Sequence, residues 1–168
     1  MDTNPKHTES EKRPHGASDR DCLQCKAKGK AVKPITISTL VMKDTLKQMG
    51  DLTGFRFCAT PSCELAYFNP ETGECIAADD VTIPIGQKAT SPGRLVCYCF
   101  NHTAEAIESE IERTGATTIP ESIAKMCREG LDLCPETNPQ GSCCLGNVRS
   151  VAKAAIAEME IAQNGGPQ

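Results

Sequence analysis

The sequence predicts an α+β protein in which a small β-rich N-terminal lobe is followed by a mainly helical lobe. Three observations lead to this prediction: β-branched and aromatic segments before residue 86, apolar residues at helical spacing after residue 95, and a polar segment rich in Gly and Pro between them. Large apolar side chains are scarce in the 168 residues, which include four Phe, two Tyr and no Trp. Small lobes with so little to bury usually need metals or disulfides to fold.

The composition divides the chain into five segments. Residues 1–20 combine Pro, Gly, Ser and charged residues without apolar periodicity, and we expect a disordered leader there. We expect the β-rich lobe at 21–86, a linker at 87–94 and the helical lobe at 95–163. The last residues, 164–168, are expected to form a frayed tail.

In the first lobe, the β-branched stretch ITISTLVM at 35–42 predicts a strand that runs into a short helix through Leu46 and Met49. The segments FRFC and CELAYFNPETGECIAA predict further strands, with a hairpin turn from Asn69 to Gly73.

In the second lobe, three helices are expected. Thr103 can cap the first helix and Gly115 can end it. Thr118 and Glu121 form a capping-box pattern for the second helix, and the third begins at about Ser142. The residues expected to face inward are Ala104, Ile107 and Ile111; Ile119, Ile123 and Met126; and Leu145, Val148, Val151, Ala155 and Met159.

Cysteine is the residue type that most needs an explanation, since the chain contains eleven. The N-terminus lacks the apolar core of a secretion signal, and no window approaches the length of a membrane span. We therefore expect a cytoplasmic protein without membrane insertion, whose thiols stay reduced and available to bind metal.

Charge and motifs exclude several function classes. A net charge of -4 and a pI near 5.4 give no electrostatic basis for binding nucleic acid. The sequence contains no Ser/His/Asp set, P-loop or GxGxxG motif. We therefore do not expect a conventional enzyme, although reduction of a metal ion through a bound redox centre is compatible with the sequence.

Two close cysteine pairs in the first lobe predict a zinc site. Cys22 and Cys25 form a CxxC motif, and Cys58 and Cys63 form a CxxxxC motif after the FRF segment. A tetrahedral four-thiolate zinc site requires two such pairs, each presented by one tight turn. The alternative, a thioredoxin-like redox pair, would need a strand before Cys22 and a helix after Cys25, and the flanking residues GASDRD and KAKGK favour neither.

A different cysteine pattern marks the second lobe. Cys97 and Cys99 are two residues apart, and a disulfide at that spacing would be badly strained. Two thiolates on one metal ion or cluster iron are the better explanation. A [2Fe-2S] cluster needs two thiolates per iron, so the CxC motif would supply one iron and two of Cys134, Cys143 and Cys144 the other.

The order of these motifs resembles that of a known family. VCYCFNHT at 96–103, the later CPETNPQGSCCLGNV, and the upstream CLQC and FCATPSCELAYFN are similar to the amino-terminal domain of the CopZ copper chaperone family, a zinc and [2Fe-2S] module. The helical lobe is also similar to [2Fe-2S] domains of the bacterioferritin-associated ferredoxin type. The resemblance spans about residues 20–163.

The resemblance implies two sets of ligands. The implied cluster ligands are Cys97, Cys99, Cys134 and Cys144, and the implied zinc ligands are Cys22, Cys25, Cys58 and Cys63. Cys144 is favoured over Cys143 because the first turn of the expected third helix would direct its positive end at Cys144, while adjacent residues point about 100° apart. In this arrangement Cys97 and Cys99 would hold one iron, and Cys134 and Cys144 the other.

The sequence also departs from the family. The MxCxxC copper motif is absent, because the only CxxC, at Cys22 and Cys25, follows the residues DRD. Copper binding through that motif is therefore not expected. We interpret Cys75 and Cys127 as small packed residues, and Cys143 as either an alternative ligand or an exposed thiol able to bind a soft metal ion.

Three hypotheses for the function follow. The first is one-electron transfer by a zinc and [2Fe-2S] protein linked to copper or another soft metal, with a redox protein, a copper-trafficking protein or copper ions as partners. The second is a ferredoxin-like electron donor to an unrelated partner. The third is an all-zinc interaction module, which the CxC spacing disfavours. We expect the lobes to hold their metals independently, so that loss of zinc would leave the cluster in place.

Overall fold

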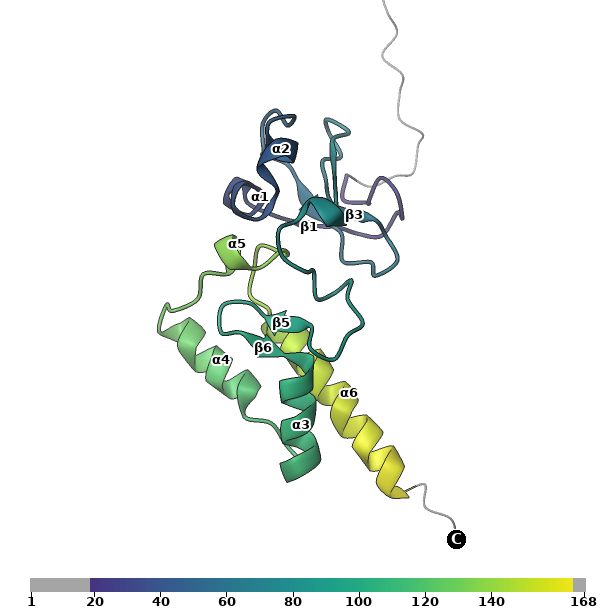
Figure 1. The fold of residues 1–168 in the computed structure, drawn as a ribbon, viewed down its shortest axis with the longest axis vertical. Helices are drawn as coiled ribbons and strands as arrows, with labels where there is room; N and C mark the ends of the chain where they lie inside the picture. Colours follow the sequence, from purple (N-terminus) through teal and green to yellow (C-terminus); the bar gives the residue numbers. More distant parts are fainter. Residues whose placement is uncertain (1–18, 165–168) are drawn as a thin grey trace, which may run out of the picture.

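The computed structural model describes residues 19–164, which form the two lobes shown in Figure 1. The leader expected at 1–20 and the tail expected at 164–168 lie almost entirely outside the described residues. The predicted α+β fold class is confirmed, since the first lobe contains a four-stranded sheet and the second is mainly helical.

The N-terminal lobe is built on an antiparallel sheet with the strand order β1-β2-β3-β4. Its strands are β1 (Lys30–Ala31), β2 (Arg56–Phe57), β3 (Leu65–Phe68) and β4 (Cys75–Ala77). β3 and β4 form the predicted hairpin. Asn69 closes its turn, because its backbone N–H donates to the Glu74 carbonyl at 2.8 Å and its side-chain oxygen accepts from the Glu71 N–H at 2.9 Å.

The strand predicted at 35–42 is wrong, because this segment forms helix α1 (Pro34–Leu40). Pro34 lies in the first turn, where its missing N–H has no helical partner to lose and its fixed φ suits the helix. Ile37 and Leu40, three residues apart, are both buried in the core. Burial at helical spacing therefore outweighs the β propensity of the branched side chains.

Two short helices, α2 (Lys43–Leu46) and η1 (Ala78–Asp80), complete this lobe. Its core includes an aromatic pair, Phe57 and Tyr67, whose ring centroids lie 5.9 Å apart in a tilted arrangement. The buried core residues are Val32, Ile37, Leu40, Val41, Phe55, Phe57, Ala66, Tyr67, Ile76, Val81 and Ile85.

The C-terminal lobe begins with a small hairpin that the sequence did not predict. Its strands are β5 (Leu95–Cys97) and β6 (His102–Thr103), which pair antiparallel. Strands this short carry too few residues to show an alternating pattern. The helices that follow are α3 (Ala104–Thr114), α4 (Ile119–Arg128), α5 (Cys134–Thr137) and α6 (Leu145–Asn164).

The predicted ends of α3 are confirmed. The Thr103 hydroxyl accepts a hydrogen bond from the Ala106 N–H at 3.1 Å, and Gly115 ends the helix with a φ of 79°. The capping box predicted for α4 is wrong. The Thr118 side chain makes no cap, and its hydroxyl instead donates to the Glu110 carboxylate at 2.9 Å.

α6 begins later than expected, at Leu145, so Cys144 precedes the helix and its carbonyl accepts from the Val148 N–H at 3.1 Å. The buried core of this lobe comprises Val96, Cys97, Ala104, Ile107, Ile111, Ile123, Cys144, Val148 and Ala152. Within residues 19–164, no helix is long and apolar enough to cross a membrane.

One segment of the second lobe rests on the first. The inter-lobe segment (residues 134–141) contains α5, which lies against α1 in Figure 1. The Thr36 hydroxyl donates to the Pro135 carbonyl at 2.6 Å, and the Tyr67 hydroxyl donates to the Pro139 carbonyl at 2.8 Å. Both donors are buried, so the two lobes share a specific polar junction.

Candidate metal centres

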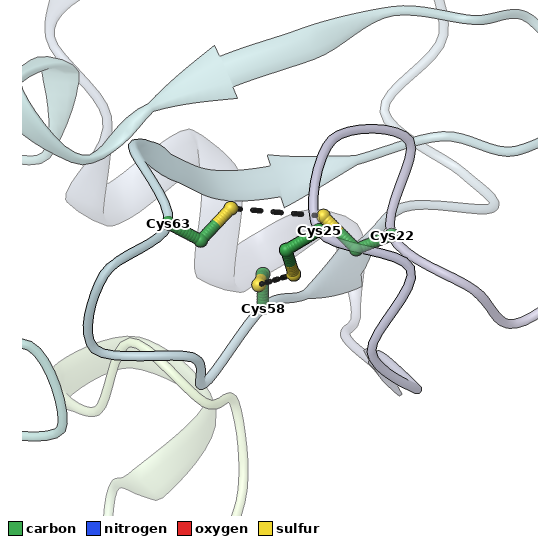
Figure 2. A group of neighbouring side chains, drawn as sticks. All are labelled: Cys22, Cys25, Cys58 and Cys63. Carbon is green, nitrogen blue, oxygen red and sulfur yellow. Dashed lines mark hydrogen bonds between the residues drawn. The ribbon is translucent and has the colours of Figure 1, made fainter.

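The structure brings together the four cysteines of the N-terminal lobe. The sulfurs of Cys22, Cys25, Cys58 and Cys63 all lie within 4.8 Å of one another and point into one space (Figure 2). Cys22 Sγ is 3.8 Å from Cys63 Sγ, and Cys25 Sγ is 3.6 Å from Cys58 Sγ. Two sulfurs bound to one tetrahedral zinc at about 2.3 Å would be about 3.8 Å apart, so these separations suit a single zinc ion.

Each pair of sulfurs is presented by a tight turn. In the first turn, the Cys22 N–H donates to the Ala27 carbonyl at 2.8 Å, and the Lys26 N–H donates to the Cys22 carbonyl at 3.0 Å. Lys26 has a φ of 62°, which lets the chain reverse after Cys25. In the second turn, the Cys63 N–H donates to the Thr60 carbonyl at 3.2 Å.

The site is largely shielded from solvent, with Cys25 half-buried. Cys22, Cys58 and Cys63 are buried and share a small cluster with Phe68. Gly29, just before β1, allows the chain to pass close to this cluster, because a Cβ at that position would lie only 2.4 Å from the Phe68 ring. Four thiolates with no open position are typical of structural zinc.

The thiols of this site differ in how readily they ionise. The hydrogen bond between Cys25 Sγ and the Thr60 hydroxyl, 3.4 Å long, is the main reason that the pKa of Cys25 falls to about 6. Burial raises the pKa of Cys22 to about 12 and also raises that of Cys63. A metal cation replaces the protons held by such buried thiols, so metal binding and proton release are coupled here.

A lysine from the connecting segment lies beside this site. Lys88 Nζ donates to the Thr60 carbonyl at 2.7 Å and to the Cys63 carbonyl at 2.8 Å. Its positive charge is favourable next to a site whose four thiolates would carry more negative charge than one zinc ion neutralises.

The four C-terminal cysteines named by the family resemblance form two close pairs. Cys99 Sγ lies 3.4 Å from Cys134 Sγ, and the thiols of Cys97 and Cys144 lie close enough for each to shift the pKa of the other. Each pair joins one cysteine of the CxC motif to one downstream cysteine. The predicted assignment of Cys97 and Cys99 to one iron, and of Cys134 and Cys144 to the other, stays a prediction.

These pairs differ from the N-terminal site in spacing. Among the described residues, the N-terminal cysteines are the only group of three or more metal-binding side chains whose ligand atoms all lie within 4.8 Å of one another. The C-terminal sulfurs therefore do not surround one ion. Two separate pairs suit two metal ions side by side, each with two thiolates, as in a [2Fe-2S] cluster.

The thiols of Cys97 and Cys144 also shift each other's pKa. The hydrogen bond with Cys144 lowers the pKa of Cys97 to about 7 and raises that of Cys144. Burial raises the pKa of Cys134. In each case the proton would have to leave before the sulfur could bind a metal ion.

The surroundings of this site differ from the sequence prediction in two respects. Cys144 precedes α6 rather than lying in its first turn, so it caps the helix start through its carbonyl. The Thr137 hydroxyl lies 3.1 Å from Cys99 Sγ, a contact that sequence analysis missed. The only available signal was the position of Thr137 three residues after Cys134, which places both on one face of α5.

Of the remaining cysteines, Cys75 differs from its prediction as a packed residue, whereas half-buried Cys127 packs against the core of its lobe as predicted. Cys75 is exposed, and its thiol lies 3.7 Å from the Gly73 carbonyl oxygen. Cys127 is half-buried, and its sulfur lies 4.0 Å from that of exposed Cys143. Sequence analysis missed this pair because its members lie on different segments, 16 residues apart.

The fold and the closed four-sulfur site define a metal-binding protein of two lobes, the first of which is a zinc-binding domain. Residues 19–82 match the CopZ-type family described as a zinc binding domain. This match confirms the resemblance of the first lobe, and two further comparisons extend it to the second.

The chain is similar to the copper chaperone CopZ of Archaeoglobus fulgidus, with 29% identity over 152 residues that make up 86% of this chain and 70% of that protein. It is also similar to the X-ray structure of the Archaeoglobus fulgidus CopZ N-terminal domain, with a TM-score of 0.63 and 25% identity. That match covers 78% of this chain and 96% of the solved chain. The predicted resemblance to the N-terminal domain of CopZ is therefore confirmed.

Proposed function

We propose that this protein is a zinc- and [2Fe-2S]-containing redox metalloprotein that takes part in handling copper or another soft metal ion. The observation that carries the proposal is the approach of Cys99 Sγ to Cys134 Sγ, 3.4 Å, in a chain that also holds four N-terminal sulfurs within 4.8 Å of one another. The metal-binding units in this proposal are the lobes at 21–86 and 95–163, joined by residues 87–94.

The zinc ligands in this proposal are Cys22, Cys25, Cys58 and Cys63. The burial of three of them and the mutual distances of all four support a structural role, because four thiolates complete the tetrahedral ligand set of one zinc ion. The chain holds these residues on two turns that are both hydrogen-bonded through the backbone.

The cluster ligands in this proposal are Cys97, Cys99, Cys134 and Cys144. When bound, a [2Fe-2S] cluster supplies one-electron transfer. The protein would hold it between the β5–β6 hairpin, α5 and the start of α6. Cys99 is the only half-buried member of the four, so the exchange of electrons with a partner is expected on its side. The Thr137 hydroxyl beside Cys99 is placed to tune the sulfur by hydrogen bonding.

The link to copper is supported by the name of the relative, the copper chaperone CopZ. In this proposal the partners are a redox protein, a copper-trafficking protein or copper ions, in a reducing cytoplasm where free thiols persist.

Metal and sulfide analysis of anaerobically purified protein, combined with EPR before and after dithionite, tests the proposal. We expect about one zinc per chain together with about two iron and two sulfide, and a signal that appears on one-electron reduction. A colourless protein that contains only zinc would refute the cluster and support the all-zinc interaction module. A reducible cluster whose EPR signal does not change when copper salts are added would favour a ferredoxin-like electron donor.

A further inference from the structure

A second cysteine pair in the C-terminal lobe has no role in either proposed centre. Cys127 lies in the last turn of α4, and Cys143 lies in the segment that leads to α6. Their sulfurs are 4.0 Å apart although the residues are 16 positions apart in sequence. The fold therefore brings two thiols together that no local motif would pair.

The distance between these sulfurs fits one shared metal ion. Two sulfurs at about 2.3 Å from a metal ion stand between about 3.8 Å and about 4.6 Å apart as the angle at the metal opens from tetrahedral to linear. The observed 4.0 Å lies within that range. A disulfide, by contrast, would require the sulfurs to approach to about 2.05 Å.

Hydrogen bonds hold the backbone on both sides of the pair. The Gln140 side-chain amide donates to the Cys143 carbonyl at 2.8 Å. The Cys127 carbonyl accepts from the Gly130 N–H at 3.1 Å. Cys143 is exposed while Cys127 is half-buried, so the pair is held in place but remains open to solvent on one side.

The donor set selects the type of ion. No third Cys, His, Asp or Glu among the described residues joins this pair with all ligand atoms within 4.8 Å. Zinc in proteins is almost always bound by more ligands than two, and harder cations prefer oxygen. Thiolates instead select soft ions such as Cu(I). Asp132, which interacts electrostatically with Cys127, adds a negative charge that favours a cation.

We propose that Cys127 and Cys143 form a third metal site, which binds one soft monovalent cation of the Cu(I) type through two thiolates. Binding releases one proton from each thiol and involves no change of oxidation state. The inference goes beyond the proposed function, since the pair can bind the ion whether or not the neighbouring cysteines hold a cluster. Exposure of Cys143 suits reversible loading from a partner or a chelator.

The test is a competition for Cu(I) between the full chain and bicinchoninate under nitrogen, with zinc and iron contents measured in the same samples. We expect wild type to hold one more Cu(I) per chain than the Cys127→Ser/Cys143→Ser variant. Loss of even a hydrogen-bond partner of a ligand weakens metal affinity by about 10- to 100-fold, so each single variant should lose at least about tenfold. Unchanged zinc and iron would show that the variants are folded.

Cys75→Ser is the matched control, because it removes an exposed thiol that has no cysteine partner among the described residues. It should retain wild-type affinity for Cu(I). Equal binding by wild type and the double variant would overturn the proposal, as would equal loss in Cys75→Ser. Displacement of zinc in proportion to the Cu(I) bound would place the ion at the N-terminal site and would also overturn it.

Discussion

The two lobes close their metal centres in different ways. In the N-terminal lobe, the turn before β1 and the turn between β2 and β3 bring four sulfurs within 4.8 Å of one another. In the C-terminal lobe, a hairpin, a short helix and the residue before α6 each supply part of the site, and the sulfurs form two separate pairs. The first arrangement suits one ion, and the second suits a larger group that spans several segments.

The two sites also differ in the hydrogen bonds that support them. The N-terminal turns are held by backbone hydrogen bonds of their own lobe and by Lys88 of the linker. The inter-lobe segment, which carries Cys134, instead accepts hydrogen bonds from Thr36 and Tyr67 of the other lobe. The contacts therefore favour a dependence of the proposed second centre on the first lobe, whereas the sequence alone suggested that the lobes are independent.

The largest effect is expected from Cys58→Ser. Structural zinc contributes an apparent free energy on the order of 10 kcal/mol, which is comparable to the whole stability of a small domain. We expect the N-terminal lobe to lose zinc and unfold, and the second centre to lose iron because the inter-lobe segment loses its support. Zinc and iron contents and circular dichroism measure both outcomes.

Cys75→Ser controls for the loss of a thiol from the same lobe and should change neither metal. If Cys58→Ser lost its zinc while the visible spectrum stayed at wild-type intensity, the lobes would be independent and the comparison above would fail.

The next effect concerns two adjacent cysteines that form a matched pair. We expect Cys144→Ser to abolish or strongly alter the visible spectrum, because Cys144 is a buried proposed ligand whose thiol shifts the pKa of Cys97. Cys143→Ser should leave the spectrum nearly unchanged, because the exposed sulfur of Cys143 is directed to Cys127. Absorption spectra and iron content of the two variants provide the measurement, and the opposite outcome would exchange their roles.

A smaller effect is expected from Tyr67→Phe, which breaks one link between the lobes. The Pro139 carbonyl would lose its hydrogen bond from a buried hydroxyl, at a cost of about 1–3 kcal/mol. Urea denaturation should show this loss, and iron should be released faster than from wild type while zinc content stays constant. Thr36→Val, which removes the bond to Pro135, should act in the same direction. Faster loss of zinc than of iron would contradict the dependence of the second centre on the first lobe.

The smallest effect is expected from a substitution of Glu110, which lies in α3 of the second lobe. Its carboxylate accepts hydrogen bonds from the Thr117 hydroxyl at 2.6 Å and from the Thr118 N–H at 3.2 Å, and these lower its pKa below the ordinary 4.5. A lowered pKa in the folded state stabilises the protein above the unfolded pKa, and this stability is lost as pH falls through the folded pKa.

We therefore expect Glu110→Gln to lower the melting temperature slightly at neutral pH and to remove part of the loss at acidic pH. The measurement is the difference between variant and wild type from pH 7 to pH 3, which cancels the loss of metal common to both. A difference that does not depend on pH would exclude the role of the carboxylate.

Local signals predicted the parts of the fold that local interactions hold together. Asn69 and Gly73 marked the β3–β4 hairpin, and Thr103 and Gly115 marked the ends of α3. Cysteine spacing similarly identified the four residues that meet in the N-terminal lobe, because each pair lies on one turn.

Features that depend on distant contacts were not predicted. β-branched residues at 35–42 suggested a strand, but the core accommodates Ile37 and Leu40 on one helix face. The pairing of Cys127 with Cys143 and the hydrogen bond from Tyr67 to Pro139 join segments that share no local pattern. The contact between the lobes was not predicted for the same reason.

The hydrogen bonds from Thr36 and Tyr67 also imply an order of assembly during synthesis. They join residues 99 and 72 positions apart, so their acceptors leave the ribosome long after the N-terminal sheet is complete. Domains generally fold in the order in which they are made. We expect refolding followed by hydrogen exchange to protect β2 and β3 before residues 134–141, and the reverse order would contradict this view. If iron were supplied before zinc, the segment 134–141, which carries Cys134, would have no folded N-terminal lobe to pack against.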